Sequence, residues 1–359
     1  MTRRGRALAA CLGLAVSLLA ACGKKGPPVA PELRAPSPAT DVTGAVDESA
    51  IAVGWTPPTR RVDNTRLRDL GLMRIFRVED GGGGEPKAAM LVDGRIAGYT
   101  EIAAIRADEP APAVARDHRL VFADRQGLAY GRRYTYVILA SDAQGRIGRP
   151  SPRVSVTYVS ATEPPVNLVA EPGERAARLR WEAPARLLDG SALTEALAYE
   201  VLRAPSADAE LAPVTRAPIQ ERALADSNLE NDRTYSYAVR AVRVVAGTTA
   251  YSGPSPRVGV TPRDMTPPSP PANLVAIPGE AIVRLSWSPS PESDVAGYIV
   301  YRAAEGGAFE RVGSTRALDT TFVDRGVARG TYRYVVTAVD SAAQPNESRR
   351  SNEARVSVP

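Results

Sequence analysis

The sequence is poor in the residues that usually carry chemistry: it has two cysteines and one histidine among 359 residues. Cys11 lies inside an apolar N-terminal run, which leaves Cys22 as the only thiol if that run is removed as a signal. The chain beyond Cys22 therefore contains no thiol for a disulfide or a thiolate metal site. Its domains must be stable through their hydrophobic cores alone.

No catalytic constellation is visible. The single histidine, His118, lies in a polar stretch and is interpreted as a surface residue rather than a base or metal ligand. Gly81–Gly84 lacks the Lys-Ser/Thr that would follow in a phosphate loop. Acidic pairs such as Glu79–Asp80 show no arrangement that assigns an acid and a base. We predict no catalytic residue, no metal, no cofactor and no enzyme activity.

Charge of one sign is not clustered. The formal net charge is +5, and removal of Arg3, Arg4 and Arg6 with an N-terminal signal would bring it closer to zero. Nucleic-acid binding requires a basic patch or stripe. We therefore expect no nucleic acid among the partners.

What the sequence does contain begins with its N-terminus. Three arginines precede the apolar run Ala7–Ala20, which is shorter than the roughly 20 residues needed to span a bilayer. This order of charge and hydrophobicity is typical of a secretory signal. The run ends in Leu19-Ala-Ala-Cys22, which resembles the lipobox of bacterial lipoproteins; the alternative is an ordinary Ala-x-Ala cleavage site with a chance cysteine. The resemblance implies thioether lipidation of Cys22, cleavage before it with loss of residues 1–21, and acylation of its amine by a palmitate-type chain.

Residues 22–38 follow as the lipidated N-terminus and a proline-rich stalk, for which we expect extended polyproline II. Lys24 and Lys25 would lie beside anionic headgroups, or else belong to a merely solvated linker. Gly23 in place of Asp favours delivery to the outer membrane, if the cell has one. The membrane, reached through Cys22, is thus the first predicted partner.

The chain beyond the stalk repeats itself three times. Trp55, Trp181 and Trp287 each end an alternating apolar pattern of period two, which places each tryptophan on the buried face of a strand. Downstream of each lies a pair of tyrosines one residue apart, and an aspartate precedes each pair. The recurring aspartates, for which we expect a structural role at a strand end, are Asp124, Asp226 and Asp324.

Many short strands separated by turn signals predict an all-β fold. The tryptophan of an early strand and the tyrosine pair of a late one resemble fibronectin type III domains, which are immunoglobulin-like β-sandwiches. The resemblance implies seven strands in two sheets, with a tyrosine corner at Tyr134, Tyr235 and Tyr332. We predict three tandem domains at residues 39–160, 164–262 and 268–359.

The first repeat is longer than the others, because the interval from its tryptophan to its first tyrosine (residues 55–134) exceeds those of 181–235 and 287–332. The extra segment falls within residues 79–121. Insertions in sandwich loops are thermodynamically inexpensive and often functional. The segment is either a functional insertion or an extended hairpin decoration.

These features predict an envelope lipoprotein that acts as a non-catalytic protein-binding or scaffolding module. One alternative is a polysaccharide-binding accessory protein, for which exposed aromatic candidates are Tyr99, Tyr130 and Tyr251. A second alternative rests on residues 22–28, which resemble the start of small outer-membrane lipoproteins that assist assembly of the lipopolysaccharide export machinery. In that case the chain would be an assembly factor acting through this segment. The partner is another envelope protein or a polysaccharide.

Overall fold

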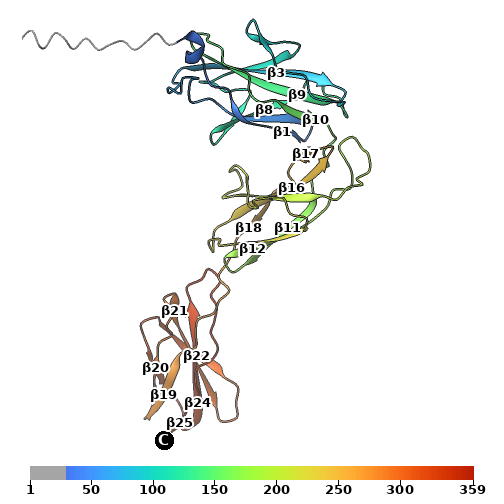
Figure 1. Cartoon of the computed structure of the whole chain (residues 1–359). Coiled ribbons are helices and arrows are strands. Elements are labelled where there is room, and N and C mark those ends of the chain that lie inside the picture. Colours follow the sequence, from blue (N-terminus) through green and yellow to red (C-terminus); the bar gives the residue numbers. More distant parts are fainter. Residues whose placement is uncertain (1–29) are drawn as a thin grey trace, which may run out of the picture. The chain divides into compact units, whose positions relative to one another are not determined.

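The computed structural model describes residues 30–359, and these form two compact units. The first unit contains Ile51–Tyr158 together with the described residues that precede Ala45. The second contains Ala45–Ala50 and Val159–Pro359. Within the second unit Val46 pairs in parallel with Ala250. Almost all regular structure in both units is β-strand, which confirms the predicted fold class (Figure 1).

The first unit is built on two sheets. One has the strand order β10-β9-β3-β6, and the other contains β1-β2-β8-β7. Their bounds are β1 (Thr40–Asp47), β2 (Ala50–Thr56), β3 (Leu70–Asp80), β6 (Thr100–Arg106), β7 (Val114–Arg116), β8 (Arg119–Asp124), β9 (Arg133–Asp142) and β10 (Val154–Thr157). Ile51, Val53 and Trp55 alternate along β2 and are fully buried, as the period-two pattern predicts.

The second unit holds two sandwiches in succession. The second sandwich pairs a sheet β11-β12-β15 with one built on β14-β13-β16 and completed by β17 and β18, which both pair with β16. Its strands are β11 (Val166–Gly173), β12 (Ala176–Glu182), β13 (Ala198–Ala204), β14 (Ala212–Pro213), β15 (Ala223–Ser227), β16 (Tyr235–Val245), β17 (Thr248–Tyr251) and β18 (Val258–Val260). Trp181 lies edge-on to Tyr199 in its core.

The third sandwich has seven strands in two sheets, β19-β20-β23 and β22-β21-β24-β25, as the fibronectin type III resemblance implies. Its strands are β19 (Ala272–Gly279), β20 (Ile282–Ser288), β21 (Val295–Ala304), β22 (Glu310–Arg316), β23 (Thr321–Arg325), β24 (Gly330–Asp340) and β25 (Ala354–Val358). Trp287 again lies edge-on to a tyrosine, Tyr298, between the sheets.

The final strand of each sandwich is preceded by a turn that contains a serine, Pro-Ser-Pro in the first two sandwiches and Arg-Ser-Asn in the third. A serine hydroxyl in the turn accepts a backbone N–H of the neighbouring strand, so a buried donor is satisfied where the ladder is broken. The three pairs are Ser151 with the Ile138 amide (2.9 Å), Ser255 with the Val239 amide (3.1 Å) and Ser351 with the Val336 amide (3.0 Å).

The tyrosine corner is present in the first two repeats. The hydroxyl of Tyr134 accepts the Ala129 amide at 2.9 Å, and that of Tyr235 accepts the Glu230 amide at 3.2 Å. Within residues 30–359 no hydrogen bond reaches the hydroxyl of Tyr332, whose ring instead faces the guanidinium of Arg302. The tyrosine corner predicted at Tyr332 is therefore not formed in the third repeat.

The insertion within 79–121 contains a hairpin and adds a small core. It contains β4 (Leu91–Val92) and β5 (Arg95–Ile96), which pair with each other. Ile96 is 2% exposed and packs with Phe76, Val137 and Leu139 on the first unit. A sheet face that would otherwise meet solvent is thereby covered.

Residues 31–38 differ from the expected extended stalk. Pro31–Arg34 form a short 3-10 turn (η1), and Pro36 makes an isolated β-bridge with Arg61. Ala35 and Ala39 are buried. This part of the chain belongs to the first unit, because its contacts with the loop at residues 59–63 outweigh the extended preference of its prolines.

Candidate functional site

The predicted lipid-attachment residue, Cys22, lies outside the described residues 30–359 and remains a prediction. The same holds for the segment 22–28. His118 is described, and it is exposed in the turn between β7 and β8. Residues 30–359 contain no group of three or more His, Cys, Asp or Glu side chains that could hold a metal ion. No helix in this range is long and apolar enough to cross a membrane.

The three recurring aspartates are structural, as predicted from their register. Each buried carboxylate accepts an arginine guanidinium from one strand and a tyrosine hydroxyl from another, and we call these groups the Asp triads. The distances to the shared Oδ2 atom are 2.7 and 2.8 Å in Arg77–Asp124–Tyr136, 2.8 and 2.6 Å in Arg203–Asp226–Tyr237, and 2.9 and 2.8 Å in Arg302–Asp324–Tyr334.

In each triad the tyrosine hydroxyl donates a hydrogen bond to the buried carboxylate. Burial raises the pKa of Tyr136, and the neighbouring Asp124 raises it further, so this hydroxyl stays protonated and donates. The sequence carries the signal for the whole triad, since each arginine lies in the C-terminal part of a strand (β3, β13 and β21) and each tyrosine is the second of its pair. From the sequence, the aspartates and the tyrosine pairs were recognised separately, and the arginines were not joined to them.

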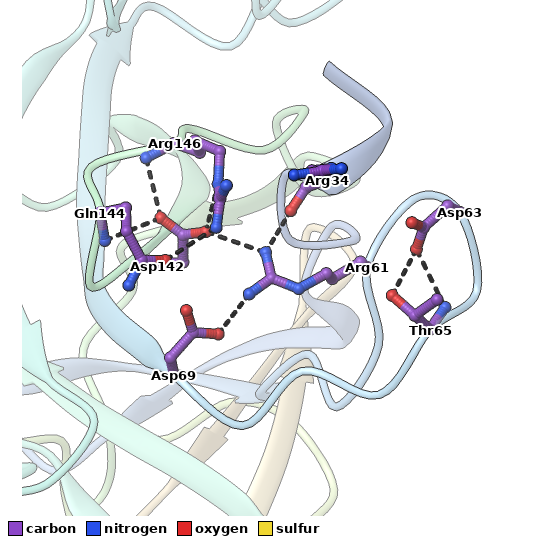
Figure 2. A network of polar contacts seen from close by, with 8 residues as sticks. All are labelled: Arg34, Arg61, Asp63, Thr65, Asp69, Asp142, Gln144 and Arg146. Carbon is purple, nitrogen blue, oxygen red and sulfur yellow. Dashed lines mark hydrogen bonds and ion pairs between the residues drawn. The ribbon is translucent and has the colours of Figure 1, made fainter. Parts of the chain in front are cut away.

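A second polar centre occurs in the first unit around Arg61 (Figure 2). Its guanidinium donates to Asp142 at 2.9 Å, to Asp69 and to the backbone carbonyl of Arg34. The Asp142 side chain has no exposed surface, whereas that of Arg61 is 13% exposed. We call Arg34, Arg61, Asp69 and Asp142 the Arg61 clamp.

Asp142 organises the clamp from the end of β9. Its carboxylate also accepts the amides of Gln144 and Arg146, at 3.0 and 2.9 Å, and the Arg146 side chain at 2.7 Å. Burial alone would raise the pKa of Asp142, but the hydrogen bonds from Arg61 and Arg146 outweigh it and lower the pKa. The carboxylate is therefore charged at neutral pH and holds Arg61 in place.

Backbone hydrogen bonds reinforce the clamp. The Asp63 amide donates to the Leu33 carbonyl at 2.9 Å, and the Val62 amide to that of Ala35 at 3.0 Å. In Figure 2 the η1 turn lies next to this loop. The polypeptide that leads into the first unit is thus fastened to it through both side chain and backbone.

The other sandwiches secure their leading segments with different residues at the same register. In the second, Arg243 occupies the position of Asp142 and donates to the Ser160 carbonyl and to Glu195, both at 2.8 Å. In the third, Asp340 holds Asn346, whose side chain reaches the Asp264 carbonyl at 3.3 Å. The charge at the end of this strand is inverted in the middle repeat.

The charged groups of an open groove on the second sandwich are also engaged. This groove, of about 360 Å³, is lined by both arginine and apolar residues. Arg203 pairs with the triad residue Asp226 at 2.8 Å, and Arg233 pairs with Glu230 at 3.1 Å. Both arginines named here are thus held by carboxylates of the same sandwich.

The predicted exposed aromatics differ in accessibility. Tyr130 is 49% exposed and stacks on buried Tyr158 with ring centroids 4.9 Å apart. Tyr251 is partly buried beneath the guanidinium of Arg240. Tyr99 is partly buried and donates its hydroxyl to the Lys87 carbonyl at 2.5 Å. Tyr130 alone among the three offers an open ring face.

Comparison with known proteins finds no family model that matches. The chain is 33% identical to Exoglucanase B of Cellulomonas fimi over 232 residues, which are 60% of this chain and 19% of that protein. It is 36% identical over 121 residues to the Amylopullulanase of Thermoanaerobacterium thermosulfurigenes, covering 33% of this chain and 6% of that protein. The chain thus spans less than a fifth of the length of either relative.

Among solved structures, the FN1–FN3 domains of chicken CNTN1 align with 90% of this chain and 99% of that one, at 15% identity and a TM-score of 0.28.

Proposed function

We propose that the chain is a lipid-anchored, non-catalytic module of the bacterial envelope that presents binding surfaces to another envelope protein. The observation that carries this proposal is the threefold repetition of the buried Asp triad. A charged group that recurs once per sandwich serves the stability of each sandwich. Within the proposal, function lies in the surfaces of the sandwiches.

The two named relatives support a non-catalytic role. An exoglucanase and an amylopullulanase are named for reactions on polysaccharides, yet the matched regions are 19% and 6% of their lengths. Within the proposal, the shared region is an accessory module, and the reactions belong to other parts of those proteins. Domains of this kind host many binding tasks, so the partner must be found by experiment.

The anchor is tested by Cys22→Ala. We expect the wild-type chain to incorporate a fatty-acid probe in cells and the variant to lose that label. Ser37→Ala, in the same leading part of the chain, serves as a control that should keep it. Persistent labelling of Cys22→Ala would refute lipidation at this residue.

The binding role is tested by crosslinking in intact envelopes followed by pulldown. We expect one envelope protein to be captured reproducibly, and its capture to survive replacement of residues 22–28 by an unrelated lipoprotein start. If that replacement abolishes the capture while the sandwiches stay folded, the assembly-factor alternative is correct and the binding proposal is wrong.

Polysaccharide binding is the second candidate, favoured by the open ring of Tyr130. A flat aromatic face can pack against the apolar face of a sugar ring. If this is the function, Tyr130→Ala should weaken retardation of the protein in gels containing soluble glucan. Tyr99→Phe, which leaves the ring in place, should not. Equal migration with and without glucan for the wild type would exclude this candidate.

A further inference from the structure

The hairpin of β4 and β5 exposes apolar side chains although it is part of a folded unit. Met90 is 62% exposed and Val92 is 49% exposed. Val92 pairs with Arg95, and directly opposed residues of an antiparallel pair point to the same face. The outer face of the hairpin therefore combines apolar surface with a positive charge.

This exposure is imposed by a well-fixed geometry. Asp93 and Gly94 form the two-residue turn with positive φ angles of 46° and 74°, which suits a tight hairpin. Arg74 donates to the Gly94 carbonyl at 2.8 Å, and Ile96 is buried on the opposite face. With Ile96 held inward, the alternation of the strands keeps Val92 outward.

Three basic residues lie in or near the hairpin, and the ammonium of Lys87 donates to the Gly98 carbonyl at 3.4 Å. Lys87 and Arg95 are exposed, and Arg153 donates to the Lys87 carbonyl at 3.0 Å. None of these three forms an ion pair with a carboxylate within residues 30–359, while Glu85 and Asp93 are the exposed acids nearest in sequence. An apolar strip with basic flanks matches an interface of acyl chains beneath anionic headgroups.

The Arg61 clamp limits how far this hairpin can be from the membrane. Because residues 31–38 are held on the first unit, only residues 23–30 can separate it from an acylated Cys22. A chain extends at most about 3.6 Å per residue, so these residues reach roughly 30 Å at full extension. The tether keeps the first unit close to the bilayer.

We propose that the outer face of the β4–β5 hairpin, with Met90, Val92 and Arg95, contacts the anionic membrane surface. The lipid anchor of the proposed function supplies the proximity on which this contact rests. The hairpin then acts as a second, reversible membrane contact that orients the first unit. Two weak membrane contacts on one chain reinforce each other through their high effective concentration.

The test uses the full chain purified from membranes and reconstituted in vesicles of phosphatidylethanolamine with or without phosphatidylglycerol. Val92→Cys carries an environment-sensitive fluorophore, and Leu318→Cys, 94% exposed in the third sandwich, is the matched control. The parent chain, treated with the fluorophore in parallel, gives the background. We expect a blue shift at position 92 that requires phosphatidylglycerol, and none at position 318.

Charge removal sharpens the test. In the chain labelled at position 92, Lys87→Gln and Arg95→Gln should each lower the apparent affinity of the hairpin for vesicles containing phosphatidylglycerol by about fivefold. The fluorescence shift at position 92 measures this affinity. A label at position 92 as solvated as that at 318 in vesicle-bound protein would overturn the proposal. So would a shift seen only in native envelopes, which would indicate a protein partner instead.

Acylation of Cys22 is scored separately by mass spectrometry of the same preparation. If Cys22 is not acylated and position 92 still shifts with phosphatidylglycerol, the anchor fails and the hairpin contact stands. If Cys22 is acylated and position 92 stays solvated, the anchor stands and the hairpin contact fails.

Discussion

At the scale of single residues, the buried aspartates determine which side chains matter for stability. β24 offers a matched pair of tyrosines: Tyr334 donates to Asp324 at 2.8 Å, whereas Tyr332 makes no hydrogen bond to the described chain. Tyr334→Phe removes a hydrogen bond to a buried carboxylate and should lower the free energy of unfolding by about 1.5–3 kcal/mol. Tyr332→Phe should change it by less than about 0.5 kcal/mol.

Denaturant unfolding monitored by the fluorescence of Trp287, which lies in the same sandwich, measures both variants. Equal losses for the two substitutions would show that the triad contributes nothing beyond the ring.

The pKa of Asp142 makes the Arg61 clamp sensitive to pH. Its folded-state pKa lies below the unfolded value of about 3.9, since the hydrogen bonds from Arg61 and Arg146 outweigh burial. A lowered pKa contributes stability that is present above the unfolded value and lost as the pH falls through the folded value. We expect amide exchange at residues 33–38, corrected for intrinsic rates, to accelerate below about pH 4.

Asp142→Asn should remove this acceleration, because the carboxylate that titrates is gone. Asp63→Asn is the control, since the exposed Asp63 also has a lowered pKa, owing first to the Thr65 hydroxyl. If Asp63→Asn removes the pH dependence of amide exchange at residues 33–38 and Asp142→Asn does not, the assignment of this dependence to Asp142 is wrong.

At the scale of elements, the clamp fixes a segment that has little secondary structure of its own. Arg61→Gln removes the charge that joins Asp142, Asp69 and the Arg34 carbonyl. It should expose residues 31–38 and increase their proteolysis by at least about tenfold, which corresponds to a loss of about 1.4 kcal/mol. Arg60→Gln is the neighbouring control, because the exposed Arg60 side chain donates to Asn64 and not to the clamp, while its backbone bond to the Ser37 amide stays in place.

Limited proteolysis followed by mass spectrometry measures both variants. Similar cleavage in Arg60→Gln and Arg61→Gln would mean that the backbone contacts alone hold the segment.

This element also shows where sequence reasoning stops. The prolines before residue 38 restrict φ and favour extended chain, which was the basis for expecting a stalk. What holds residues 31–38 is a guanidinium from residue 61 and a carboxylate from residue 142, and no local pattern relates positions so far apart. The small insertion core has the same character: the longer first repeat indicated an insertion, but not the burial of Ile96.

At the scale of the whole molecule, each repeat has its own tryptophan-centred core, and these cores were predictable because strand alternation is a local property. Leu285→Ala, at a 2% exposed position beside Trp287, should cost about 2–5 kcal/mol. In a chain that retains only Trp287, we expect this substitution to lower the unfolding midpoint detected by that tryptophan. In a second chain that retains only Trp55, which lies in the other unit, the same substitution should leave the unfolding midpoint unchanged.

A common shift for both tryptophans would show that the two units unfold as one. The matched measurement on the unsubstituted chain gives the two reference midpoints.

The inverted charge at the end of the long strand has a consequence for how such a repeated gene can change. Asp142 and Asp340 are replaced by Arg243 in the middle repeat. A recombination event that moved this strand from the second repeat into the first would place its arginine beside Arg61 in place of Asp142, leaving Asp69 as the one clamp carboxylate facing two guanidinium groups. We expect such a product to be less stable than the parent chain. The substitution therefore makes the first and middle repeats poorly interchangeable at this strand.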